Sequence, residues 1–165
     1  MFSPEQLDAA SDVLAACRDA GLMLTTAESC TGGLIAGCLT AVAGSSDVVD
    51  RGFVTYTNQA KAEMLGIAPE LIERFGAVSN EVACAMAEGA LAKSSADLAV
   101  AVTGIAGPTG GTDEKPVGLV HFAVAAKGGR TIDKHHVFDG DRTAVRAQTL
   151  TKALKLLKIE AEEPS

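Results

Sequence analysis

Hydrophobic residues recur along the chain with two spacings, one typical of helices and one typical of buried strands. Between Leu7 and Cys17 they return every three or four residues and predict an amphipathic helix that ends near Gly21. Ser3 and Gln6 have the spacing of a helix-capping pair, so this helix is expected to begin directly after Ser3. Short apolar runs predict strands at residues 22–26, 51–57, 98–103 and 117–124.

Helical patterns separate most of these strands, and they cover residues 34–44, 58–65, 69–75, 81–94 and 141–157. Three polar residues are expected to cap these helices: Asn58, Ser79 and Asp141. A further strand over residues 130–138 is expected to pair antiparallel with the strand before it, across a glycine turn. This alternation predicts one domain over residues 1–165 with an α/β fold, a three-layer α/β/α sandwich around a mixed sheet.

Composition narrows the classes of protein that fit this pattern. The 165 residues are 47% hydrophobic and 21% charged, which excludes intrinsic disorder, and no apolar run is long enough to predict a membrane span. A net charge of −7 disfavours direct nucleic-acid binding but leaves room for a small anion in a local basic pocket. The first residues lack a signal-peptide pattern, so a cytoplasmic location is expected. The four cysteines lack paired zinc-site spacing and are expected to be mostly buried.

Ligand sites in open α/β sheets gather beyond the carboxyl ends of strands, where loops meet helix N-termini. Four segments of the sequence have this position, and they cover residues 27–33, 55–61, 103–111 and 138–142. Candidate chemistry is therefore sought in these four junctions.

The first junction places Ser29 just ahead of a helix, where backbone N–H groups can stabilise a negative oxygen. Gly32 and Gly33 leave room there for a substrate. The alternative is that Ser29 or Thr31 only caps the helix. Cys30 is a second candidate nucleophile, because a helix N-terminus lowers the pKa of a thiol. The alternative is that the Cys30 side chain is buried and inert.

A serine nucleophile needs a base, and none of the three histidines lies at a junction, so a Ser-His-Asp triad is not expected. Lys61 is the better candidate, because desolvation in a cleft favours the neutral amine that accepts a proton. The alternative for Lys61 is a solvated surface position. Tyr56, five residues earlier, either orients the amine or the substrate, or packs as an ordinary strand residue.

The third junction is rich in glycine and is either an anion cradle or a plain mobile loop. It has neither the Walker A pattern nor a GxGxxG pattern, so ATP and dinucleotide binding lose their main support. Arg142 and Arg146 lie four residues apart on one face of the last helix. They suit either a phosphate or surface pairing with Asp or Glu.

Several motifs in order resemble the CinA C-terminal domain family, the nicotinamide-nucleotide amidases, over nearly the whole chain. They are the AESCTGG segment at residues 27–33, GFVTYTN at 52–58 with Lys61, AVS at 77–79, TGIAGP at 103–108 and GDR at 140–142. The resemblance implies hydrolysis of the carboxamide of nicotinamide mononucleotide to nicotinate mononucleotide and ammonia, with no metal or organic cofactor. An extra N-terminal domain found in many members has no counterpart in this sequence, so the stand-alone amidase form is expected.

The resemblance also implies roles for particular residues. Ser29 is the expected nucleophile and Lys61 its base or proton shuttle, while Tyr56 and Thr103 orient these groups or the amide. Backbone N–H groups near residues 30–32 are expected to bind the negative oxygen, and Arg142 with the loop 104–111 to hold the ligand and its phosphate. The full set of expected substrate-binding residues is Cys30, Thr31, Gly32, Gly104, Gly107, Gly110 and Arg142.

Two other functions stay open on the sequence alone. One is a non-catalytic nucleotide-binding module in which the glycine loop and Arg142 hold a phosphate and Ser29 caps its helix. The other is an interaction module that associates through its sheet edge or an alanine-rich helix face. A homo-oligomer is also compatible with the sequence.

Overall fold

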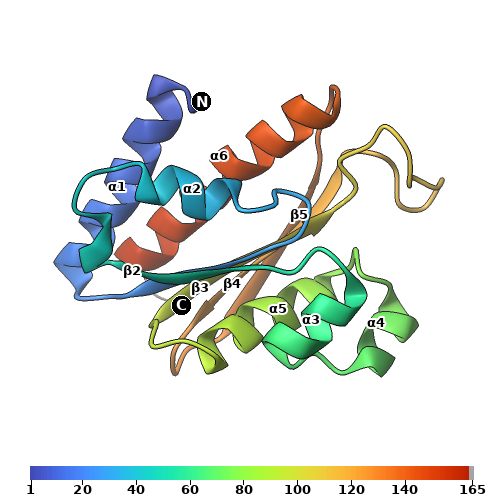
Figure 1. Ribbon diagram of the computed structural model, residues 1–165, viewed down its shortest axis with the longest axis horizontal. Helices are drawn as coiled ribbons and strands as arrows, with labels where there is room; N and C mark the ends of the chain where they lie inside the picture. Colours follow the sequence, from blue (N-terminus) through green and yellow to red (C-terminus); the bar gives the residue numbers. More distant parts are fainter. Residues whose placement is uncertain (164–165) are drawn as a thin grey trace.

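The structure, a computed structural model, describes residues 1–163 and arranges them as one five-stranded mixed sheet between two layers of helices (Figure 1). The strands are β1 (Leu24–Glu28), β2 (Val49–Val54), β3 (Leu98–Gly104), β4 (Leu119–Ala126) and β5 (Thr131–Val137). The helices are α1 (Pro4–Ala20), α2 (Leu34–Thr40), the short 3-10 helix Ser45–Asp47, α3 (Asn58–Leu65), α4 (Pro69–Phe75), α5 (Asn80–Ala92) and α6 (Arg142–Glu162). The expected three-layer α/β/α fold is confirmed. Within residues 1–163, no helix is long and apolar enough to cross a membrane.

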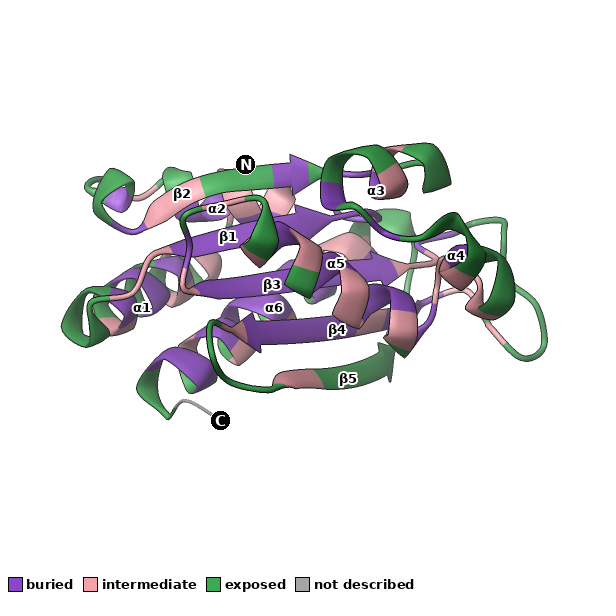
Figure 2. Ribbon diagram, turned by 90° about the horizontal axis from the view of Figure 1, so that it is seen from below, coloured by how far each residue is buried: buried purple, intermediate pink, exposed green. Residues whose placement is uncertain are grey.

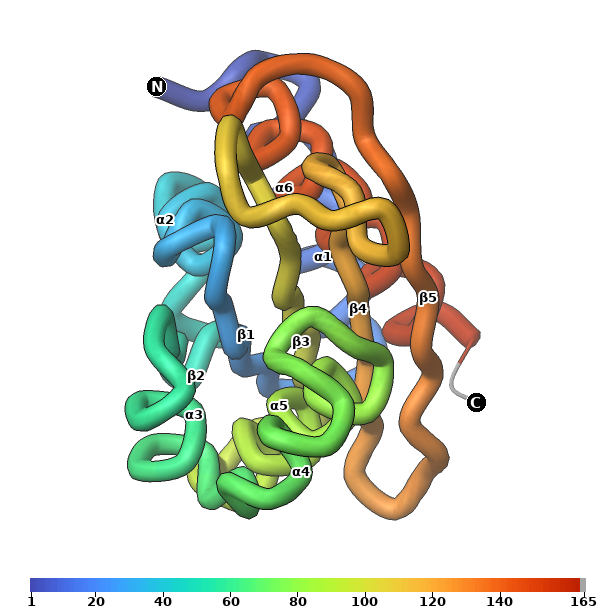
Figure 3. Tube along the Cα trace, turned by 90° about the vertical axis from the view of Figure 1, so that its right-hand side faces the viewer, coloured from blue at the N-terminus to red at the C-terminus, as the bar shows by residue number. Residues whose placement is uncertain are grey.

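The strand order is β2-β1-β3-β4-β5, with β1 parallel to both β2 and β3, and with β4 and β5 each antiparallel to the strand before it. Because β1, β2 and β3 run in the same direction, their carboxyl ends meet at one end of the sheet. The turn after β1, the start of α3 and the loop after β3 come together at that end, which faces the viewer in Figure 3.

The two faces of the sheet carry side chains of different size. Helices α1, α2 and α6 cover one face and α3, α4 and α5 the other (Figure 1). Along β3, Leu98, Val100 and Val102 pack in the core under α1 and α6, while Ala99 and Ala101 alternate toward α5. The small alanine face lets the alanine-rich α5 lie close to the sheet, and the central strands are buried on both sides (Figure 2).

Some element boundaries differ from those expected. β2 ends at Val54 instead of residue 57, and α3 is capped by Thr57, whose hydroxyl accepts a hydrogen bond from the Ala60 amide, and not by Asn58. The backbone of Thr57 is extended, and its side chain caps the first turn of α3. Strand β2 therefore ends before this residue. Helix α2 ends at Thr40, before the expected limit at residue 44.

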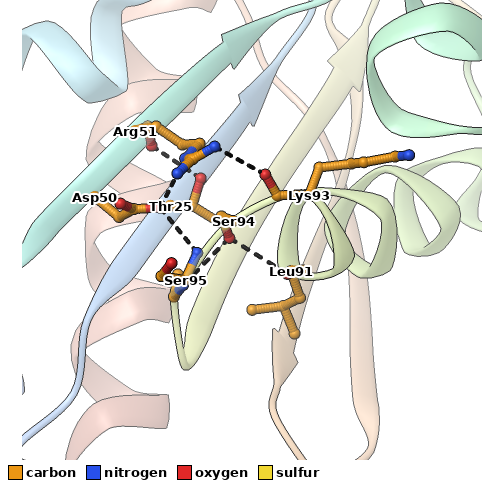
Figure 4. Close-up of polar contacts among 8 residues, drawn as sticks. Thr25, Asp50, Arg51, Leu91, Lys93, Ser94 and Ser95 are labelled. Atoms are coloured by element: carbon orange, nitrogen blue, oxygen red, sulfur yellow. Dashed lines mark hydrogen bonds and ion pairs between the residues drawn. The ribbon is translucent and has the colours of Figure 1, made fainter.

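A polar cluster fastens β2 to the end of α5 at the amino end of the strand (Figure 4). Arg51 Nε lies 2.7 Å from Asp50 Oδ2, and Arg51 Nη1 donates to the Lys93 carbonyl at 3.0 Å. The same Asp50 oxygen accepts from the Ser95 amide at 3.0 Å, and the Thr25 hydroxyl donates to the Arg51 carbonyl at 2.8 Å. This cluster lies at the opposite end of β2 from the strand ends that converge in Figure 3.

Candidate active site

The turn after β1 brings Ser29 to the wall of a cavity. β1 covers residues 24–28 instead of the expected 22–26, so Glu28 ends the strand and Ser29 follows it directly. Gly32 and Gly33 then adopt left-handed φ values of +59° and +98°, which glycine reaches without steric penalty. The cavity, of about 200 Å³, lies where this turn, the start of α3 and the end of β3 meet.

Glu28, which the sequence did not single out, holds this turn from inside the protein. The side chain is fully buried. Its carboxylate accepts hydrogen bonds from the amides of Gly33, Ile35 and Ala36 at 3.1, 3.0 and 2.8 Å and from the Thr31 hydroxyl at 2.6 Å. A negative group at this position also interacts favourably with the positive end of the helix dipole. Glu28 therefore supplies the hydrogen-bond acceptors for the backbone amides at the N-terminus of α2.

The alternative that Ser29 or Thr31 caps α2 is wrong. The helix begins after Gly33 without a side-chain cap from that residue, and the Thr31 hydroxyl is a donor to Glu28. Because Glu28 takes the helix amides, Ser29 faces the cavity with its Oγ 3.1 Å from the Nζ of Lys61.

Lys61 comes from α3 and is only 1% exposed, so the alternative of a solvated surface lysine is wrong. Its Nζ donates to Ser29 Oγ at 3.1 Å and to the Thr55 carbonyl at 3.0 Å. Across residues 1–163, no carboxylate lies within ion-pair distance of this amine. Burial lowers the pKa of Lys61 from its usual 10.5, because desolvation disfavours the charged form. The amine is thus suited to accept a proton from the serine hydroxyl.

Cys30 also lines the cavity but is not poised as a nucleophile. Burial, with a smaller contribution from the nearby Glu28 carboxylate, raises the pKa of the Cys30 thiol to about 11. At neutral pH the thiol is therefore protonated, and the alternative in which a helix N-terminus activates it is wrong. As expected, most of the cysteines are buried, and all four are free thiols.

The far wall of the cavity is formed by the end of β3 and the segment before α5. The Thr103 hydroxyl donates to the Ala77 carbonyl at 2.8 Å, which fixes that segment against the strand. Ala77 and Val78 both line the cavity beside Gly104. The Thr103 side chain, 1% exposed, thus orients the wall of the site and has no hydrogen bond to Lys61 in the described chain.

Arg142 and Tyr56 form the rim. Tyr56 is 56% exposed and its hydroxyl accepts from Arg142 Nη2 at 2.6 Å, so the alternative of ordinary strand packing is wrong. Arg142 Nη1 donates to the Gly107 carbonyl at 3.0 Å. Neither Arg142 nor Arg146 has an Asp or Glu partner in residues 1–163, contrary to the surface-pairing alternative. A second cavity, of about 280 Å³, shares Arg142 and Ala106 with the first.

The structure brings most of the expected residues together around the first cavity: Ser29, Cys30, Tyr56, Lys61, Thr103, Gly104 and Arg142. Four other expected residues do not line it: Thr31, Gly32, Gly107 and Gly110. Asn58, Ala77, Val78 and Ala106 also line it; the sequence placed them in a helix cap, in motifs or in the glycine loop without giving any of them a role of its own in the site. In the described part of the chain, no three His, Cys, Asp or Glu side chains are grouped as metal ligands would be.

Comparison with known proteins identifies the family of the chain. The model of the CinA C-terminal domain matches residues 6–161. The chain belongs to the CinA C-terminal domain family. It is 48% identical, over 95% of both chains, to the nicotinamide-nucleotide amidohydrolase PncC of Escherichia coli K12. It also matches 34% of the longer CinA-like protein of Geobacter sp. strain M21 at 54% identity.

Among solved structures, the competence/damage inducible protein CihA from Agrobacterium tumefaciens superimposes with a TM-score of 0.94. That protein is 52% identical, with 99% of each chain covered. The α/β fold described above is thus shared with this solved structure.

Proposed function

We propose that this protein hydrolyses the carboxamide of nicotinamide mononucleotide and releases nicotinate mononucleotide and ammonia in the cytoplasm. The observation that carries the proposal is the contact of 3.1 Å between Lys61 Nζ and Ser29 Oγ at the wall of a cavity. Family membership and the name of the Escherichia coli relative indicate the substrate.

The reaction proceeds in two steps. Neutral Lys61 accepts the hydroxyl proton as Ser29 Oγ forms a bond to the amide carbon, and the carbonyl oxygen becomes negative. The C–N bond then breaks, and Lys61 returns the proton to the departing nitrogen, which leaves as ammonia. In the second step a water molecule loses a proton to Lys61 and attacks the ester, and Ser29 regains its hydrogen as the acid leaves.

Two backbone N–H groups are suited to bind the negative oxygen. The amides of Cys30 and Thr31 donate to no other residue within residues 1–163, whereas the next amide, of Gly32, donates to the Ser29 carbonyl. The amides of Gly33, Ile35 and Ala36, where α2 begins, are held by Glu28, and the expected donors lie before them, near residues 30–32. The two amides beside Ser29 are therefore the donors in this proposal.

The adjoining cavities match the two halves of the substrate. The smaller one, at Ser29, receives the ring that carries the amide, and the larger one receives the ribose and phosphate. Arg142 lies on the border of both and has only a carbonyl and a phenol as partners. An arginine without a carboxylate partner is available for a phosphate.

An ammonia-release assay on the purified full chain tests the proposal. We expect turnover of nicotinamide mononucleotide, slower turnover of the riboside that lacks the phosphate, and nicotinate mononucleotide as the product. Tight binding of the nucleotide without ammonia release overturns the proposal and indicates the non-catalytic binding module. Self-association stays a prediction, which light scattering of the full chain tests.

A further inference from the structure

Arg146 reaches from α6 to the turn that carries Ser29. It follows Arg142 by one helical turn and is half-buried. Its Nε donates to the Cys30 carbonyl at 3.1 Å and its Nη2 to the Thr31 carbonyl at 2.9 Å. We propose that Arg146 is a positioning residue that holds the backbone amides of the oxyanion site in their productive orientation. This inference rests on the proposed amidase function.

Peptide geometry links the guanidinium to those amides. The peptide bond between Cys30 and Thr31 is trans, so its C=O and N–H groups point in opposite directions. When Arg146 binds the Cys30 carbonyl, it therefore fixes the direction of the Thr31 N–H. Binding of the Thr31 carbonyl fixes the Gly32 N–H in the same way, and that amide closes the turn on the Ser29 carbonyl at 3.1 Å.

Glu28 and Arg146 hold this turn with opposite chemistry. The Glu28 carboxylate accepts from the amides that begin α2, and the Arg146 guanidinium donates to the two carbonyls before them. The Thr31 residue is held by both groups, through its hydroxyl and its carbonyl. A turn fixed from two sides keeps the remaining free N–H groups in place without reorganisation during the reaction.

Arg146 lines neither cavity, which separates it from Arg142. The added Cβ of any residue at Gly32 would lie 3.6 Å from Arg146 Nη2, so the guanidinium packs directly against the turn. The expected consequence is a change in the rate of the chemical step with little change in substrate binding.

The test is steady-state ammonia release by Arg146→Met and Arg146→Lys, with the wild type and Arg142→Met measured in parallel. We expect Arg146→Met to lower kcat by about 100-fold, the size of effect seen when one oxyanion donor is lost, and to leave KM within about threefold. Arg146→Lys retains a cation but cannot donate to both carbonyls at once, and its kcat should fall by about tenfold. Arg142→Met should instead raise KM.

Arg18→Met is the matched control. Arg18 Nη2 also donates to a backbone carbonyl, that of Gly44 at 2.9 Å, but this contact joins the end of α1 to the segment before the amino end of β2, and neither residue lines the cavity. Its loss should leave kcat and KM unchanged. Guanidinium chloride at low millimolar concentration should restore part of kcat in Arg146→Ala, where the truncation leaves space for it, and should not restore kcat in Arg146→Met, whose side chain fills that space.

The outcomes separate the inference from the proposed function. An inactive wild type overturns the amidase function itself. An active wild type whose Arg146→Met and Arg146→Lys variants keep kcat within threefold, or raise only KM, overturns the positioning role alone. If Arg146→Met does not unfold cooperatively, Arg146→Lys decides: a fall in kcat at constant KM supports the role, and wild-type kcat contradicts it.

Discussion

Basic side chains lie near both ends of β2, and they differ in how they are paired. At the amino end Arg51 is paired with Asp50 and donates to the Lys93 carbonyl (Figure 4). At the carboxyl end, Lys61 and Arg142 donate hydrogen bonds only to hydroxyl groups and carbonyls among residues 1–163. A basic side chain that is paired with a carboxylate fastens elements together. One without a carboxylate partner keeps its charge for a ligand or, where its pKa is lowered, offers a neutral amine that accepts a proton.

The largest effect expected from this comparison is at Lys61. Lys61→Met retains the length and apolar stem of the side chain but removes the amine that accepts the Ser29 proton. We expect kcat to fall by about 10²- to 10⁴-fold, the usual contribution of a general base. Ammonia release measures it, and a variant with wild-type kcat would show that the amine is a structural donor only.

The pH dependence of Lys61 sharpens the same prediction. Since burial lowers the pKa of Lys61 from 10.5, kcat/KM should rise with pH as the amine loses its proton and level off below pH 10.5. In the unfolded chain the amine binds its proton more tightly than in the folded protein. The free energy of unfolding of the wild type should therefore rise between the lowered pKa and 10.5, and this rise should be absent in Lys61→Met. Identical pH profiles of stability would contradict the shifted pKa.

The variant Glu28→Gln tests whether this buried carboxylate beside the site has a structural role. Glu28→Gln replaces one acceptor oxygen by an amide NH₂ that faces backbone donors, which leaves buried N–H groups without a partner. Each such loss costs about 1–3 kcal/mol, so we expect the free energy of unfolding in urea to fall by about 2 kcal/mol and kcat to fall as well. Asp50→Asn at the other end of β2 is the control and should leave kcat unchanged. A Glu28→Gln variant with the wild-type free energy of unfolding would contradict the role of Glu28 in holding the turn after β1.

Arg142 should affect binding more than rate. Arg142→Met removes the guanidinium on the border of the two cavities, and we expect KM for nicotinamide mononucleotide to rise by about 10- to 100-fold. The riboside without phosphate should be affected much less. An equal rise in KM for both substrates would show that Arg142 does not bind the phosphate.

The smallest effect is expected at Arg51. Arg51→Met breaks a half-exposed ion pair, and such pairs contribute about 0–1 kcal/mol. The free energy of unfolding in urea should fall by an amount within that range, and the rate of ammonia release should equal that of the wild type. A large loss of activity would mean that the two ends of β2 are coupled, against the comparison above.

Local patterns in the sequence located Ser29, Lys61 and Arg142, because strand-to-helix junctions on one edge of a parallel sheet must converge. They did not single out Glu28, and they offered Arg146 for a phosphate or for surface pairing, not for the carbonyls of the turn after β1. The contact of Arg146 with Cys30 joins residues 116 positions apart, and no short-range periodicity encodes it. The end of β1 was placed two residues too early, which left Glu28 in a loop instead of on the strand that aims it at α2. Boundaries of this kind depend on side-chain contacts made only in the folded chain.

The pairing of a serine hydroxyl with a buried amine is tested most directly by ammonia release from nicotinamide mononucleotide by Ser29→Ala, compared with Cys30→Ala and the wild type. We predict that Ser29→Ala binds the nucleotide but releases no ammonia above background, while Cys30→Ala retains most of the wild-type rate. Wild-type turnover by Ser29→Ala, or its loss in Cys30→Ala alone, would contradict the assignment of Ser29 as the nucleophile.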